Sequence, residues 1–171
     1  MTLFWIIAGI VLLFGFVVAF GAPYVPSLRG EVKNAFDDLY PVGDKDFIVD
    51  LGSGDGLVLS EAARRGAGGL GYELNPLLVL ISNLRLRGKA MVKLQNMWTT
   101  DLPGKTTLVY AFTVSRDSKR LGRYIQQQAD KQNRTFMIMT FGSQLSGFQP
   151  VRSIKAHSLY EISPQDSALQ S

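Results

Sequence analysis

Apolar and polar residues change their spacing several times along the chain, and each change marks an expected structural element. The first pattern is a run of 20 uncharged residues from Leu3 to Ala22. About 20 apolar residues in a helix match the roughly 30 Å hydrocarbon core of a bilayer. This run therefore predicts an N-terminal transmembrane helix, and residues 1–22 are expected to form a membrane anchor.

Two alternative interpretations of this apolar run remain, a cleaved signal peptide and a buried core helix. A cleaved signal peptide would fit the small residues Ala19 and Gly21, but no basic residue precedes the run. A buried core helix would normally be apolar on one face, whereas this run is apolar on all sides. Arg29 and Lys33 follow the run, so the positive-inside tendency predicts a single-pass membrane protein whose globular part is cytoplasmic.

The segment 23–46 is expected to form a linker and a first helix. Ser27 can cap a helix that runs to about Leu39. Four apolar residues lie at the spacing of one helix face: Val32, Ala35, Phe36 and Leu39. We expect that face to pack against the rest of the globular part.

Strands and helices alternate between residues 47 and 164, which are expected to form one domain. Apolar runs predict strands at 47–51, 70–74, 90–98, 107–113 and 135–141, with two more near 151–155 and 159–162. Helical patterns predict helices at 57–65, 76–87 and 117–131. This alternation is typical of an α/β sheet with parallel strands, which the last two strands could close as an antiparallel pair. Residues 165–171 are expected to form a flexible tail.

The expected helix after Asn75 has a strong start signal. Asn75 can cap this helix, and Pro76 suits its first position. The pattern predicts that four apolar side chains of the helix face inward: Leu77, Leu78, Ile81 and Leu84.

The amino-acid composition excludes several kinds of catalytic and metal site. The 171 residues include no cysteine and one histidine, His157, which excludes a thiolate nucleophile, a disulfide scaffold and a metal cluster of Cys or His ligands. We therefore expect no metal site. Apolar residues make up 46% of the chain, a globular value, and the net charge of +4 is a mild excess. Such an excess suits a surface near anionic lipid or nucleic acid without requiring either.

A glycine-rich turn carries most of the functional information. The first expected strand leads to Asp50, after which Gly52, Gly54 and Gly56 open a helix. Glycine allows the positive φ of a tight strand-to-helix turn and lets the backbone approach a ligand. The spacing G-x-G-x-G differs from the dinucleotide pattern G-x-G-x-x-G, because Leu57 occupies the last position. The spacing therefore disfavours a pyrophosphate ligand.

Glu73 is the second element of the expected site. It ends the second expected strand, so its carboxylate should lie beside the glycine turn at the carboxyl edge of the sheet. A carboxylate at this position can accept hydrogen bonds from ribose hydroxyls. A surface glutamate before a helix cap is the plain alternative, but Glu73 and the glycine turn together are a specific combination.

The segments Asp50–Gly56 and Gly71–Pro76 resemble the class I S-adenosylmethionine-dependent methyltransferases. With Pro23–Pro26 after an apolar run, the chain looks most like the membrane-anchored protein-lysine methyltransferases known from mitochondria and their prokaryotic relatives. The resemblance is sharp between about residues 23 and 98. It implies a Rossmann-like methyltransferase sheet of seven strands, mostly parallel with an antiparallel last strand, and S-adenosylmethionine as cofactor.

The resemblance also implies which residues bind the cofactor. Gly52, Gly54 and Gly56, together with Ser53, would lie along its methionine part. Asp50 would orient the amino group of that part.

The remaining implied contacts concern the nucleoside. Glu73 would bind the ribose, while Asn96, Met97 and Trp98 would flank the adenine. Relatives commonly carry an acidic residue near the position of Asn96 and often a basic residue at that of Leu57. This chain departs from the family at both positions.

The implied function is N-methylation of lysine on a membrane or membrane-proximal protein. The expected partners are a protein acceptor and, through residues 3–22, the membrane. Methyltransferases of nucleobase amino groups usually carry Asn/Asp-Pro-Pro-aromatic after the fourth strand, where this chain has Thr113-Val114-Ser115, so nucleic acid is disfavoured. Two alternatives stay open: a methyltransferase for a small molecule, lipid or RNA, and a non-catalytic membrane-tethered module that binds the cofactor or a partner.

Overall fold

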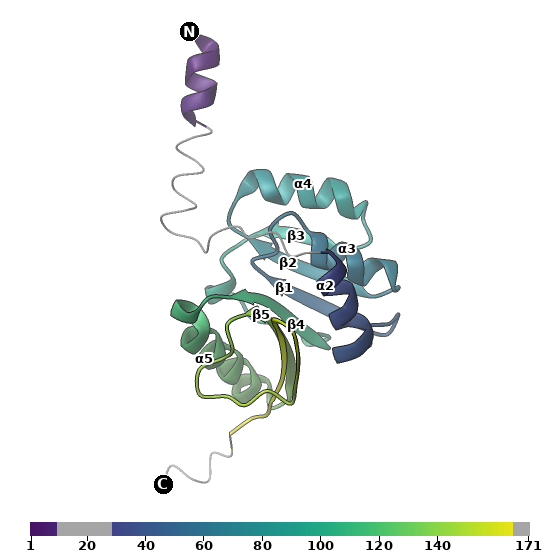
Figure 1. Cartoon of the computed structure of the whole chain (residues 1–171). Coiled ribbons are helices and arrows are strands. Elements are labelled where there is room, and N and C mark those ends of the chain that lie inside the picture. The colour runs from purple at the N-terminus through teal and green to yellow at the C-terminus, as the bar shows by residue number, and fades with distance from the viewer. Residues whose placement is uncertain (10–28, 166–171) are drawn as a thin grey trace.

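The computed structural model describes residues 1–9 and 29–165 (Figure 1). Residues 2–9 are helical. Within the described ranges, no helix is both long and apolar enough to cross a membrane. Most of the expected transmembrane helix, residues 10–22, lies outside the described residues, as do linker residues 23–28 and tail residues 166–171.

Seven strands form one sheet in the order β3-β2-β1-β4-β5-β7-β6. Their bounds are Phe47–Leu51 (β1), Gly68–Glu73 (β2), Met91–Leu94 (β3), Leu108–Thr113 (β4), Phe136–Gly142 (β5), Arg152–Ile154 (β6) and His157–Ile162 (β7). The strands from β3 to β5 pair in parallel, whereas β7 is antiparallel to both β5 and β6. The predicted α/β sheet, mostly parallel with an antiparallel end, is confirmed.

Helical segments connect the strands. Their bounds are Arg29–Asn34 (α2), Ala35–Leu39 (η1), Leu57–Arg64 (α3), Pro76–Leu86 (α4), Met97–Thr99 (η2) and Ser115–Gln132 (α5). The first expected helix is described from Arg29 onwards and changes to π-helical geometry at Ala35. Its four predicted apolar positions are all buried: Val32, Ala35, Phe36 and Leu39.

Two apolar cores flank the sheet. Ile48 belongs to the first core and its neighbour Val49 to the second, because successive strand residues point to opposite faces. Side chains of α2, η1 and α3 fill the first core, and side chains of α5 fill the second. The central strands β1, β4 and β5 are therefore buried on both faces, which holds the loops at their carboxyl ends on a rigid frame.

The α4 helix begins as predicted. The side-chain oxygen of Asn75 accepts hydrogen bonds from the backbone N–H groups of Leu77 (3.0 Å) and Leu78 (3.4 Å). Pro76 occupies the first turn of the helix. The cap predicted from the sequence is confirmed.

The inward face of α4 was predicted wrongly. Leu77, Ile81 and Leu84 are exposed, while the buried residues of the helix are Ser82 and Leu86. Small and polar side chains suit this interface, because the helix lies against backbone: Ser82 Oγ donates to the Gly54 carbonyl at 2.8 Å. A leucine at that position would displace the glycine turn.

The third strand is shorter than predicted. It ends at Leu94, and the Asn96 side chain then accepts a hydrogen bond from the Trp98 N–H at 3.0 Å and caps η2. Met97 and Trp98 therefore lie in a 3₁₀ turn rather than in a strand. The N–H of Gln95 donates to the Glu73 carbonyl at 3.0 Å, which keeps this turn beside the end of β2.

Candidate cofactor-binding site

The turn between β1 and α3 depends on left-handed glycines. Gly52, Gly54 and Gly56 have φ angles of 80°, 53° and 76°, a region that strains residues with a Cβ. The N–H groups of Gly52 and Ser53 both donate to the Tyr72 carbonyl, at 2.9 and 3.0 Å. The turn is thereby fixed to β2, and its conformation explains why the sequence places glycine at every second position.

Glu73 lies against this turn, as predicted. Its Oε2 accepts a hydrogen bond from the Gly54 N–H at 2.9 Å. Its Oε1 accepts from the N–H groups of Leu74 and Asn75, both at 2.8 Å. Because a carboxylate oxygen can accept about two hydrogen bonds, Oε2 keeps capacity for one more donor, such as a ribose hydroxyl.

Asp50 and Ser53 hold buried polar atoms without a partner among the described residues, namely Asp50 Oδ2 and Ser53 Oγ. Asp50 is 2% exposed. Burial, together with the negative charges of Glu73 and Asp55, raises the pKa of Asp50 to about 8. A buried carboxylate is unfavourable unless a cation or donor meets it, so this geometry suits a positively charged ligand group.

The turn is open at Gly52. A Cβ built on Gly52 meets no atom within 4 Å, although the backbone there cannot readily accept a side chain. S-adenosylmethionine fits the surrounding groups, because it carries an ammonium group suited to Asp50 and ribose hydroxyls suited to Glu73. The backbone of the glycine turn could then approach the methionine part directly.

Two residues of α4 support the turn, and neither was predicted from the sequence. Besides its hydrogen bond to the Gly54 carbonyl, Ser82 lies so close that a Cβ on Gly56 would be 3.0 Å from its own Cβ. Arg85 Nη1 forms an ion pair with Asp55 Oδ2 at 2.6 Å. A serine among leucines could have signalled the first contact, whereas no local pattern points to the second.

Asn96, Met97 and Trp98 lie at the same edge of the sheet, joined to Glu73 by the neighbouring Gln95 hydrogen bond. The Trp98 ring makes an edge contact with Tyr124 at 6.1 Å between centroids. The Arg120 guanidinium lies over the same ring at 4.2 Å. These two α5 contacts hold the Trp98 ring in place, and its role beside adenine stays a prediction.

The strand order, the antiparallel β7 and the glycine turn beside Glu73 define the fold of the class I S-adenosylmethionine-dependent methyltransferases. An RNA methyltransferase from Salinibacter ruber, solved with S-adenosyl-L-homocysteine, shares this fold. The two structures align with a TM-score of 0.70 at 20% identity, over 86% of this chain and 98% of that one.

In sequence, the chain is similar to proteins named as lysine N-methyltransferases of the ATP synthase C subunit. The Xenopus laevis protein is 44% identical over 63 residues, which are 37% of this chain and 27% of that protein. The Caenorhabditis elegans protein is 33% identical over 99 residues, 52% of each chain. The match thus spans about half or less of these relatives' own length. No protein-family model matches the chain.

Proposed function

We propose that this chain is an S-adenosylmethionine-dependent methyltransferase. One observation carries the proposal: the Asp50 carboxylate is buried and lacks a partner for Oδ2 among the described residues, next to a glycine turn that is open at Gly52. A buried carboxylate that served only the fold would normally be hydrogen-bonded. An arriving ammonium group would supply the missing partner.

The proposed roles follow from the geometry of the site. The bound cofactor would supply an electrophilic methyl group on its sulfonium. Asp50 would hold the ammonium group, Glu73 Oε2 would accept from the ribose, and the glycine turn would let the backbone approach the methionine part. Because methyl transfer is an in-line displacement, this positioning would be the main contribution of the chain to the rate.

The proposed acceptor is a lysine of a membrane or membrane-proximal protein. The support is the name of the relatives, which describes them as lysine N-methyltransferases that act on ATP synthase. A lysine amine attacks only when neutral, and its pKa in water is about 10.4. A desolvated site would lower that pKa and so raise the neutral fraction.

Residues 3–22 are proposed to anchor the chain as a single transmembrane helix, with the domain in the cytoplasm. The support is the run of 20 uncharged residues, together with the exposure of Leu3, Phe4 and Trp5 in the described part of it. Alkaline extraction of membranes tests the anchor, since a spanning helix should keep the chain in the pellet. Release into the supernatant would contradict it, and protease added outside intact cells should spare a cytoplasmic domain.

The activity is tested with methyl-labelled S-adenosylmethionine, the full-length chain and isolated membranes. We expect label on lysine in the protein fraction. Gly52→Arg should abolish the label by filling the cofactor space, whereas Gly147→Arg should not. Gly147 is a matched control, because its φ is also positive, 87°, and its Cβ would also meet nothing within 4 Å.

The other outcomes separate the alternatives. Label in lipid or RNA would move the acceptor to that class of molecule. No label in any fraction, from a protein that binds the cofactor, would indicate a non-catalytic module.

A further inference from the structure

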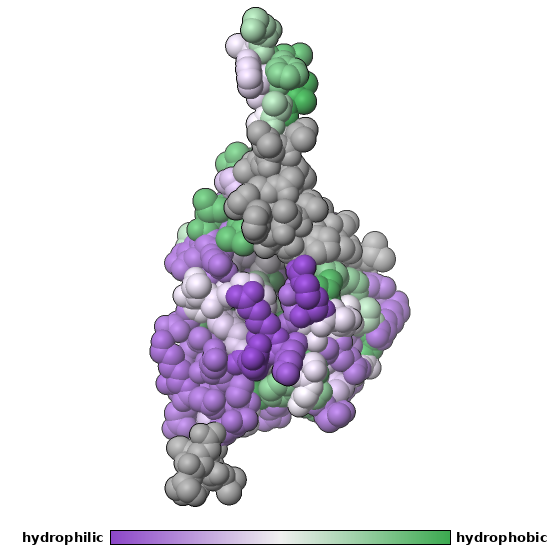
Figure 2. Space-filling model, turned by 90° about the vertical axis from the view of Figure 1, so that its left-hand side faces the viewer, coloured by the Kyte–Doolittle hydropathy of each residue, from purple (hydrophilic) through white to green (hydrophobic). Residues whose placement is uncertain are grey.

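The outer face of α4 is unusually apolar for an exposed helix. Leu77, Leu80, Ile81 and Leu84 are 40%, 57%, 39% and 68% exposed. They follow the spacing i, i+3, i+4 and i+7, so they form one continuous strip, called here the α4 strip. Figure 2 shows hydrophobic atoms at the surface of the upper part of the domain, at the height where Figure 1 places α4. Such a strip is typical of an interaction surface.

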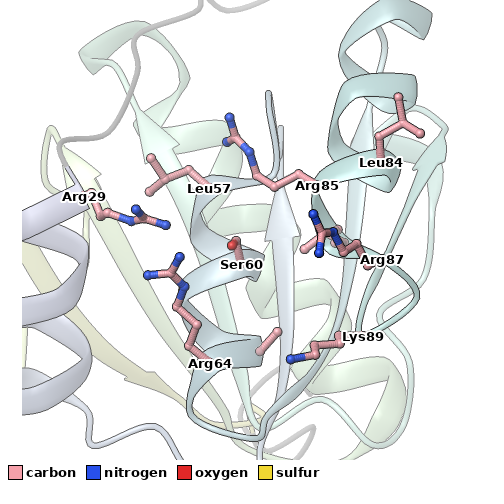
Figure 3. A pocket seen from close by; sticks show the side chains of 10 residues that line it. Arg29, Leu57, Ser60, Arg64, Leu84, Arg85, Arg87 and Lys89 are labelled. Carbon is pink, nitrogen blue, oxygen red and sulfur yellow. The ribbon is translucent and has the colours of Figure 1, made fainter.

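A strongly basic cavity lies at the C-terminal end of this helix. It has a volume of about 710 Å³ between α3 and α4. Its rim carries five cationic side chains, contributed by α2, α3, α4 and the segment after α4: Arg29, Arg64, Arg85, Arg87 and Lys89. In Figure 3 their charged ends surround Ser60, and Leu84 of the α4 strip stands beside them.

The positive charge of this cavity is only partly balanced. Glu61 pairs with Arg29 at 2.6 Å and with Arg64 at 3.5 Å, and Arg85 pairs with Asp55. Arg87 and Lys89 have no ion pair with any residue in the ranges that the structure describes. The cavity therefore presents a surplus of hydrogen-bond donors and positive charge, which suits a phosphate group.

The α4 strip and the basic cavity adjoin at Leu84 and Arg85. A ligand that covers both must therefore combine apolar and anionic groups, which distinguishes among RNA, a protein helix and a lipid bilayer. RNA would satisfy the cations but would leave the leucines in water. An apolar protein helix would cover the leucines but would offer nothing to the cations. An anionic bilayer surface meets both, because acyl chains lie directly below phosphate headgroups.

We infer that α4 docks on an anionic phospholipid surface, with the α4 strip at the boundary of headgroups and acyl chains and a lipid phosphate in the basic cavity. The α4 helix begins three residues after Glu73. Docking would therefore place the candidate cofactor site close to the membrane surface. The inference does not rest on the proposed methyl transfer, and lipid contact can be measured without it.

The absence of cysteine allows a direct test, since one introduced cysteine carries the only label. The full-length chain with Leu80→Cys is labelled with an environment-sensitive dye and reconstituted into phosphatidylcholine vesicles, with or without phosphatidylglycerol. Nitroxide lipids then quench any dye that touches the bilayer. Gln127→Cys is the control position, because it is also exposed on a helix, α5, which packs on the other core.

We expect quenching at position 80 in anionic vesicles, little quenching at 127, and a loss of the effect at about 1 M salt, where charges are screened within about 3 Å. The variant R87E/K89E should lower the ratio of docked to undocked domain by more than about 25-fold, because each removed cation accounts for about fivefold and the two introduced carboxylates are repelled by the anionic lipid. The control variant K119E/R123E reverses two exposed cations of α5 and should leave quenching unchanged.

Three results would overturn the inference. The first is equal quenching at positions 80 and 127 in anionic vesicles. The second is quenching at position 80 that is the same with and without phosphatidylglycerol and is unchanged in the variant R87E/K89E. The third is a dye response at position 80 that rises with protein concentration in detergent micelles without vesicles, which would assign the α4 strip to a second copy of the chain.

Discussion

The Glu73 carboxylate accepts a hydrogen bond from the Gly54 N–H at 2.9 Å and so joins the end of β2 to the turn that follows β1. The same side chain also accepts from the N–H groups of Leu74 and Asn75. It therefore fixes the backbone of the proposed cofactor site, and its Oε2 is the acceptor proposed for a ribose hydroxyl. A single substitution there should disturb both the shape and the chemistry of the site.

Replacing Glu73 by alanine should weaken the binding of S-adenosylmethionine by about 1.5–3 kcal/mol, since hydrogen bonds to a charged group are lost. That loss corresponds to roughly 10- to 150-fold in the dissociation constant. Glu73→Gln keeps one acceptor oxygen and should lose less. Calorimetric titration measures both, and wild-type affinity in Glu73→Ala would show that the ribose lies elsewhere.

Gly52→Arg should abolish cofactor binding while the domain stays folded. The substituted side chain would enter the open space over the turn. Strain at positive φ would destabilise the fold by about 1–2 kcal/mol in this variant and equally in Gly147→Arg. Circular dichroism checks folding and calorimetry checks binding. Equal affinity in the two variants would mean that the cofactor does not occupy this space.

Binding of the cofactor should release protons through Asp50. The raised pKa, about 8, keeps this carboxyl mostly protonated near neutral pH without a ligand. A bound ammonium group favours the ionised form, so up to about one proton should leave at about pH 7. Calorimetry in buffers of different ionisation enthalpy measures this release. Asp50→Asn should remove it, and equal release in both proteins would exclude Asp50 as the contact.

The same shift has a consequence for stability in the absence of ligand. The folded-state pKa of Asp50 lies above its ordinary value of 3.8. The contribution of this group to stability is therefore fully present below about pH 4 and is lost as pH rises through about 8. In Asp50→Asn, urea unfolding should show a smaller decline over this pH window than in the wild type. An unchanged decline would show that other groups cause it.

His157 should lower the stability of the fold as the pH falls, the opposite of the effect of Asp50. It is buried, with Nε2 2.9 Å from the Tyr110 hydroxyl, and burial lowers its pKa to about 4. Its neutral form stabilises the fold above about pH 6.5, and up to about 3 kcal/mol should be lost as pH falls through 4. Urea unfolding of detergent-solubilised wild type and His157→Gln measures the difference. Identical acid sensitivity would contradict the assignment.

The glycine turn and Glu73 could be predicted from the sequence because their signals are local. Positive φ at Gly52, Gly54 and Gly56 leaves few other residues possible, and Glu73 follows from its place at the end of a strand. The cap at Asn75 was equally local. These features need no knowledge of distant contacts.

The predictions from the sequence were wrong where a residue's environment depends on contacts with residues distant in the chain. The apolar period of α4 cannot tell a protein core from another apolar neighbour, so Leu77 and Leu84 were expected to be buried. The end of β3 depended on the Asn96 side chain turning back to cap η2. The contact of Ser82 with the glycine turn joins positions 28 residues apart, so the serine among leucines marks an unusual position without identifying its partner.

The most direct test of cofactor binding is a calorimetric titration of S-adenosylmethionine into the full-length chain in detergent micelles, beside Gly52→Arg. We expect micromolar affinity in the wild type and none in the folded variant. A wild type that is folded by circular dichroism and binds no S-adenosylmethionine would contradict the central claim, because the glycine turn and the buried Asp50 carboxyl would then serve another ligand.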